Sequence, residues 1–175
     1  MDDAVAWSRD RLLAWSDFQA EFNPAAPEDA HSAIRFRPTW TVDSDSRQDE
    51  IMFLLKDLRL HTEFLPLLSW VRPTQSGDTL LLHERGRFDL AELARRETAN
   101  LQRDFENRLF PTRGKNEEQR KQHAREDSAR MIAVKIEDVM REFGRRSAEY
   151  DIQTDFGRNV SWQTKYDDTF ARLRS

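Results

Sequence analysis

The segment from Leu80 to Glu92, which reads LLLHERGRFDLAE, constrains the fold of this chain more than any other stretch. Its leucines supply a buried face at helical spacing, and a histidine and a glutamate stand side by side among them. Asp78 and Thr79 precede the segment, where a negative charge and a capping hydroxyl stabilise a helix N-terminus. We therefore expect a long central helix from about Thr79 to about Leu109, ended by the sequence FPTRG that follows.

Two more helices are expected beyond this one. Residues 115–130 are nearly all charged or polar, which is typical of the solvated start of a helix rather than of a binding surface. The buried face of this second helix is predicted to be Met131, Ile132, Val134, Ile136, Val139, Met140 and Phe143. A turn is expected at residues 150–157. It leads to a last helix that carries Val160, Trp162, Tyr166, Phe170 and Leu173.

The first part of the chain has the two-residue period of strands. Apolar and polar residues alternate from His31 to Asp43, and Pro38 places this strand at an edge or a bulge. Asp43–Ser46 is expected to be a polar turn, and one or two further strands are expected between Ile51 and Trp70. A helix over residues 49–58 stays open, because periodicity alone does not exclude it. The pattern predicts an α+β fold, a small N-terminal antiparallel sheet packed on two or three long helices.

Composition bounds the class of protein. We expect a single domain over residues 1–175, strand-rich in 1–73 and helical in 74–175. The apolar share is 38%, but five Trp and eleven Phe supply a core. A net charge of −4 with interspersed signs predicts no nucleic-acid partner. No apolar run reaches the length of a membrane span, and no disulfide or thiolate metal site exists without cysteine. The N-terminus lacks the pattern of a signal peptide, so a cytoplasmic location is expected for the chain as given.

The His–Glu pair suggests a specific chemistry. In zinc peptidases the pattern H-E-x-x-H places two histidine ligands one helical turn apart, with the glutamate as general base. His83 and Glu84 match its first two letters, but the position four residues after His83 is Arg87. A guanidinium does not deprotonate to ligate zinc. We expect Glu84 to pair with Arg87 instead, because side chains three residues apart meet on a helix.

Three separated pieces of the chain together resemble a bacterial family of proposed zinc-dependent proteases, still catalogued as a domain of unknown function. The first is LAWSDFQ at residues 13–19. The second joins SWV at 69–71 to LLHERGRFDLAE at 81–92. The third is Tyr150 and Asp151 with TDFG at 154–157, followed by Gln163 and Tyr166. The family shows L-x-W-x-D-F, then L-L-x-H-E-x-x-H-F-D-I-x-E, then Y-D-x-x-T-x-H-G. The resemblance implies a zincin-like fold and a periplasmic or secreted location if a signal peptide has been removed.

Two departures from the family pattern fall on expected ligands. Arg87 stands in place of the second helix histidine, and Phe156 in place of the histidine of T-x-H-G, the natural third ligand. A catalytic zinc site needs three protein ligands, and only His83 is kept. The Arg87 charge would repel a divalent cation by about 4 kcal/mol per charge product at ~4 Å and an effective dielectric of about 20. We therefore expect no cofactor, with His83 and Glu84 as remnants of a ligand and a general base.

The sequence leaves three hypotheses for function. The first is a non-catalytic homologue of a zinc peptidase, a pseudoprotease, whose cleft at His83, Glu84, Arg87 and Phe156 binds a peptide or a protein. The second is an active metallopeptidase that holds zinc through substitute ligands such as Glu92 or His61. The third is a structural or assembly protein without a ligand. Motifs of serine hydrolases and of nucleotide-binding enzymes do not occur.

Overall fold

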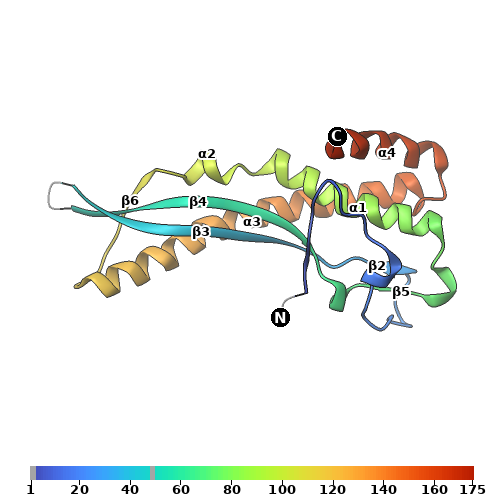
Figure 1. The fold of residues 1–175 in the computed structure, drawn as a ribbon, viewed down its shortest axis with the longest axis horizontal. Coiled ribbons are helices and arrows are strands. Elements are labelled where there is room, and N and C mark those ends of the chain that lie inside the picture. The colour runs from blue at the N-terminus through green and yellow to red at the C-terminus, as the bar shows by residue number, and fades with distance from the viewer. Residues whose placement is uncertain (1–2, 48–49) are drawn as a thin grey trace.

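The computed structural model describes residues 3–47 and 50–175, with residues 45–47 described by their backbone alone. An antiparallel sheet combines with a set of helices, so the predicted α+β class is confirmed. The molecule is elongated (Figure 1). A long β-hairpin and the first half of the longest helix extend to one end, and the other long helices gather near the chain termini at the opposite end.

The hairpin consists of β3 (Ile34–Arg47) and β4 (Glu50–Phe64), paired in antiparallel register. β4 also pairs with β1 (Val5–Ala6) at one end and with β6 (Leu109–Pro111) at the other. Among the described residues β3 pairs with β4 alone, so it is an edge strand, as Pro38 predicted. β2 (Ala30–His31) and β5 (Trp70–Val71) form a separate two-stranded sheet.

Two predictions for this region need correction. Asp43–Ser46 is not a turn but the continuation of β3, because Asp43 lies beside β4 and pairs with Lys56 at 2.9 Å. The helix alternative is wrong for the described part of its range, 50–58, which lies in β4. A β-bulge there explains the ambiguous period: the register shifts between Thr39 and Thr41, and Asp57 opposite takes a positive φ of 55°. Apart from Glu63, which pairs with Arg35 and Arg37, the buried residues therefore fall at 53 and 55 before the bulge and at 58, 60, 62 and 64 after it.

The central helix is shorter than predicted. α1 spans Asp78–Thr98, and the short α2 spans Leu101–Phe105. The break falls at Asn100, whose side chain accepts a hydrogen bond from the Arg103 amide and so caps a new helix. The helix was predicted to end at about Leu109, before the break at Phe110 and Pro111. These three residues form β6 instead.

The second predicted helix is α3 (Glu117–Thr154), and the last is α4 (Val160–Arg174). α3 continues through residues 150–154, so the predicted turn occupies only the residues after Thr154. On α3, Ile132 and Val139 are buried as predicted, but Val134 and Met140 are exposed. No helix in the described residues is both long and apolar enough to cross a membrane.

The core lies between the sheet and the helices α1 and α3. Its main cluster joins Phe53, Leu55 and Leu58 of β4 to Ile132 and Val139 of α3. A second cluster packs Leu13 and Phe18 from the N-terminal segment against Phe64 and Phe88. The aromatic segment at residues 13–19 therefore anchors the start of the chain on β4 and α1.

Trp7, Asp89 and Arg174 form a terminal clamp, which joins the N-terminal segment of the chain and the end of α4 to α1. The indole of Trp7 donates to Asp89 at 2.7 Å, and Arg174 donates to both Asp89 oxygens at 2.9 and 2.6 Å. Arg174 also donates to three backbone carbonyls of residues 8–11 and stacks over the Trp7 ring at 5.1 Å. Asp89 is buried, and these contacts compensate its charge.

Candidate functional site

The site lies where the first turns of α1 meet the end of α3. α1 directs His83, Glu84 and Arg87 inward on one face. Gly86 permits this close packing, because a Cβ at its position would lie 2.2 Å from the Tyr150 hydroxyl. The last turn of α3 and the turn after it bring Asp151 and neighbouring residues against this face. The four residues His83, Glu84, Arg87 and Asp151 are called the Arg87 cluster below.

His83 is held by contacts on both ring nitrogens and on one ring face. Its Nδ1 lies 3.2 Å from Thr154 Oγ1 and 3.4 Å from Gln163 Oε1. The Thr154 hydroxyl donates its hydrogen to the Tyr150 carbonyl at 2.6 Å, so both neighbours accept and Nδ1 carries a hydrogen. The Tyr150 ring stacks on the imidazole at 4.4 Å, nearly parallel. His83 Nε2, the nitrogen that would face a metal, faces Arg87 and Asp151 instead.

Arg87 lies at the centre of the cluster. Its guanidinium donates to Glu84 Oε2 at 3.2 Å, to Asp151 Oδ1 at 2.7 Å and to Ser147 Oγ at 2.5 Å. Its Nη2 lies 3.3 Å from His83 Nε2. Burial lowers the pKa of Arg87, but the charges of Glu84 and Asp151 outweigh this effect and raise the pKa above its ordinary value. The site therefore contains a permanent cation in contact with two carboxylates.

The two carboxylates have different surroundings. Glu84 is only 1% exposed and accepts from Ser32 at 2.5 Å in addition to Arg87. Asp151 is partly exposed and contacts both His83 and Arg87. Burial raises the pKa of Asp151, but the hydrogen bond with His83 and the charge of Arg87 prevail and hold its pKa below the ordinary value. Glu84 therefore has Arg87 as an ion-pair partner.

Phe156 closes the site from the turn between α3 and α4. Its ring lies 5.6 Å from the His83 imidazole, measured between centroids, and it is 38% exposed. The turn approaches α1 closely at Gly157, where φ is +91° and a Cβ would meet the Thr79 carbonyl at 2.9 Å. The structure thus brings together His83, Glu84, Arg87 and Phe156, which the sequence grouped as one cleft.

The two proposed substitute ligands lie elsewhere. Glu92 is buried on α1, where Thr62, Arg95 and Arg96 all donate to its carboxylate. His61 lies on β4, where its Nε2 is 3.4 Å from the Thr39 hydroxyl. Neither residue contacts the Arg87 cluster in the interactions of the described residues. Among the described residues, therefore, neither joins His83 in a group of potential metal ligands.

The donor set does not fit zinc. Within the described part of the chain His83 is the one histidine at the site, and a guanidinium lies against the nitrogen that would bind the ion. No group of three or more potential metal-ligating side chains occurs among residues 3–47 and 50–175. A catalytic zinc ion requires three protein ligands, and adding a cation beside Arg87 carries a Coulombic cost.

Sequence reasoning assigned no role to several residues of the site. Ser147, Tyr150, Asp151 and Thr154 recur at helical spacing on α3 and all touch His83 or Arg87. That i, i+3, i+4, i+7 pattern could have identified them, if the helix had been extended to Thr154. Ser32 precedes β3, and no pattern in the sequence marks it as a partner of Glu84.

A cavity of about 360 Å³ opens beside Glu84 and Phe156. Residues 27–30 form another part of its wall. The Asp29 carbonyl accepts from the Arg72 amide at 2.8 Å, and His31 pairs with Trp70, so Asp29 and His31 face β5. Since backbone groups alternate in direction along a strand, the N–H and C=O of Ala30 point away from β5. One wall of the cavity therefore includes the outer edge of β2 at a single residue, Ala30.

No protein-family model, curated protein or solved structure matches the chain.

Proposed function

We propose that this chain is a metal-free relative of zinc peptidases, a pseudoprotease, that binds an extended peptide in the cavity beside Glu84. The observation that carries the proposal is the place of the Arg87 guanidinium, in contact with His83, Glu84 and Asp151. In the zinc-peptidase pattern the second ligand projects from this helix position, and the general base is the residue after the first ligand. Arg87 replaces the charge of an ion and leaves Glu84 paired rather than catalytic.

Peptide binding is supported by the walls of the cavity. The N–H and C=O of Ala30, for which no partner occurs among the described residues, offer the main-chain hydrogen bonds by which a strand edge binds an extended peptide. Leu80 and Phe156 add apolar surface for a side chain of the peptide. A zincin-like fold remains part of the proposal, and it is supported by the α1 motif beside this strand edge.

The absence of zinc binding is tested by calorimetric titration of zinc into the wild type and into the double variant Arg87→His/Phe156→His. We expect no binding by the wild type and strong binding by the double variant, because the number and geometry of ligands determine zinc affinity. The two single variants are matched controls, since each supplies one nitrogen ligand fewer. Stoichiometric zinc in the wild type, lost in His83→Ala, would contradict the proposal. So would a folded double variant that gains no affinity.

Peptide binding is tested by selection from a phage-displayed library of random heptapeptides. Ala30→Pro removes the N–H that points away from β5 but not the bonds between β2 and β5. We expect the wild type and the control Ala30→Gly to enrich the same peptide sequences. Ala30→Pro should not enrich these sequences. Equal enrichment by all three proteins would show that the strand edge plays no part in binding.

A further inference from the structure

A second region suited to binding lies at the other end of the molecule, between β3 and the first half of α3. It consists of two cavities of about 270 and 590 Å³ that share Val42 as a lining residue. The smaller cavity also borders β4 at Phe53 and α3 at Arg120, and the larger one borders Trp40 and Arg125. These two cavities are called the strand–helix groove below.

The groove combines an apolar floor with a strand that lacks a partner on one side. Phe53 is 2% exposed and belongs to the main core cluster, against which Trp40 and Val42 also pack. Within the described residues β3 pairs with β4 alone, so its outer N–H and C=O groups have no strand to bind. Such an edge is a template for adding an extended segment.

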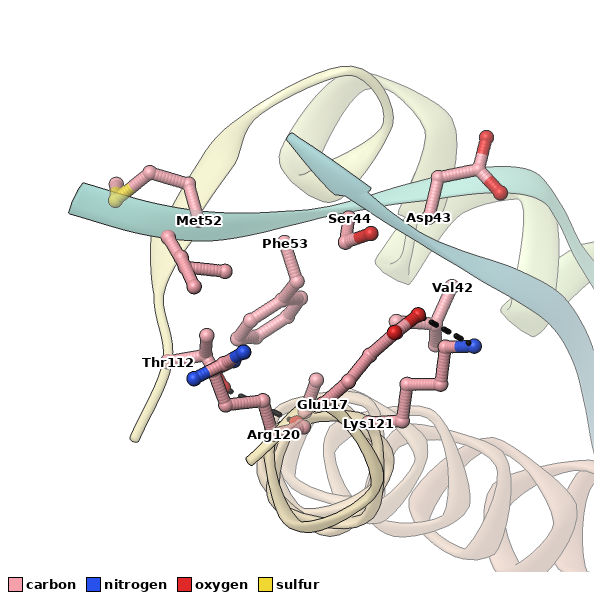
Figure 2. Close-up of a pocket in the computed structure, with 11 residues that line it drawn as sticks. Val42, Asp43, Ser44, Met52, Phe53, Thr112, Glu117, Arg120 and Lys121 are labelled. Atoms are coloured by element: carbon pink, nitrogen blue, oxygen red, sulfur yellow. Dashed lines mark hydrogen bonds and ion pairs between the residues drawn. The ribbon is translucent and has the colours of Figure 1, made fainter. Parts of the chain in front are cut away.

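The charges at the groove favour an acidic occupant. Lys121 pairs with Glu117 at 3.1 Å, and Asp43 pairs with Lys56 at 2.9 Å, so these charges are compensated. Figure 2 shows the first pair and the Arg120 side chain, which extends from α3 toward Phe53. The guanidinium groups of Arg120 and Arg125 form no ion pair or side-chain hydrogen bond with any described residue. Glu126, also on this wall, accepts from Gln122 and lies 3.8 Å from His123, so two arginines without an ion-pair partner face one carboxylate that has no Lys or Arg partner in the described contacts.

From this combination we infer that the strand–helix groove binds an extended acidic peptide segment of a partner protein. The segment adds to the outer edge of β3, places apolar side chains on Trp40, Val42 and Phe53, and directs carboxylates to Arg120 and Arg125. This function is separate from the cavity beside Glu84, which lies at the opposite end of the elongated molecule (Figure 1). Failure of either proposal leaves the other intact.

The test measures fluorescence anisotropy of two labelled hexapeptides with capped ends, one alternating valine with glutamate and the other alternating valine with lysine. Four proteins are compared: the wild type, Arg120→Glu/Arg125→Glu, Arg120→Gln/Arg125→Gln, and the control Arg130→Glu/Arg141→Glu. The control changes net charge by the same amount on the same helix, but its arginines are exposed and paired with Asp127 and Asp138. Neither of its arginines lines the groove.

We expect the acidic peptide to bind the wild type and the control alike. We expect its affinity for both groove variants to fall by about tenfold or more, since a charge-assisted hydrogen bond contributes roughly that factor. The glutamine variant keeps the test decisive if the reversed charges prevent folding. A third probe, the acidic peptide N-methylated at alternate residues, cannot pair along one edge, and we expect it to bind weakly.

Several outcomes would overturn the inference. These are equal binding of the acidic and basic peptides, equal loss in the groove variants and the control, and undiminished binding of the N-methylated probe. Absence of acidic-peptide binding to the wild type would do the same. Analytical sedimentation tests a different occupant, a second copy of this chain. If the wild type is a dimer and the groove variants are monomers, the groove binds a second copy instead of a partner peptide.

Discussion

Removing the guanidinium of Arg87 is the most direct test of how the site is stabilised. In Arg87→Ala, Glu84 loses its cation partner and keeps one hydrogen bond, from Ser32. Asp151 loses its contacts with the guanidinium and keeps His83. The side chain of Glu84 is 1% exposed in the folded protein, so only water that enters the space left by the guanidinium can replace the lost partner.

The size of the effect follows from this burial. Breaking a buried ion pair by removing one partner costs about 3–5 kcal/mol, because the remaining charge is left uncompensated. Since Ser32 and His83 still contact the two carboxylates, we expect the lower end, about 3 kcal/mol. With a urea dependence of about 2 kcal/mol per molar, the unfolding midpoint should fall by about 1.5 M. That is a large part of the stability of a typical domain, about 5–15 kcal/mol.

The measurement is urea unfolding at neutral pH followed by circular dichroism, with Arg145→Ala as the control. Arg145 also donates to two carboxylates, Glu142 and Glu149, but it lies on the exposed side of α3. Exposed ion pairs contribute little, so the control midpoint should stay close to that of the wild type. If Arg87→Ala shifts the midpoint no further than the control does, the buried-pair reasoning is wrong.

The same variant has a defined pH dependence. The folded pKa of Asp151 lies below its ordinary value of 3.8, so its interactions stabilise the fold fully above that pH. This stabilisation is lost as the pH falls through the folded pKa. We therefore expect the stability difference between the wild type and Arg87→Ala to be largest near neutrality and to narrow below pH 3.8. A difference that stays constant across this range would mean that Arg87 does not act on Asp151.

Three further predictions use the same unfolding measurement. Gly86→Ala should cost about 1–3 kcal/mol by overpacking, whereas Gly144→Ala, which meets no atom within 4 Å, should stabilise the fold by about 0.5–1 kcal/mol; equal effects would contradict the close helix contact. Arg174→Ala should lower the free energy of unfolding by about 3 kcal/mol or more, because buried Asp89 loses its cation partner, whereas the nearby Arg172→Ala should change this energy little. Similar values for the two variants would mean that the clamp does not stabilise the fold. Asn116→Ala should cost about 1 kcal/mol by removing the cap of α3, and Asn116→Asp should restore it.

The sequence predicts an element well where the hydrophobic pattern of the segment depends only on which of its faces is buried. The strand β3 follows from periodicity, because it keeps one face toward the core, but it begins at Ile34, and His31, where the strand was predicted to start, belongs to β2. The solvated start of α3 follows from its charged composition. The region of β4 is ambiguous because the bulge at Asp57 moves the buried side chains from odd to even positions. No window that spans the bulge has a single period. The polar end of β3 resembles a turn because its partner strand, and not its own sequence, holds it extended.

Prediction of the site succeeded on α1 and was incomplete on α3. His83, Glu84 and Arg87 lie within one helical turn, so their proximity follows from helix geometry. The contacts of Asp151 and Ser147 depend on how α3 crosses α1, which is a tertiary property. Gly86 shows why that crossing is hard to predict. The close approach of the two helices requires a residue without a side chain, and a single glycine in a helix does not indicate which element packs against it.

The terminal clamp has a consequence for the order in which the chain folds. It joins Trp7 and Asp89 to Arg174, so it can form only after nearly all of residues 1–175 have left the ribosome. The β3–β4 hairpin, by contrast, has both of its strands available once residue 64 has emerged. Contacts between such distant residues carry the largest loop-closure entropy and come late in folding. Until α4 docks, the carbonyls of Ser8, Arg9 and Arg11 lack this donor, so residues 8–11 are among the last to become fixed during synthesis.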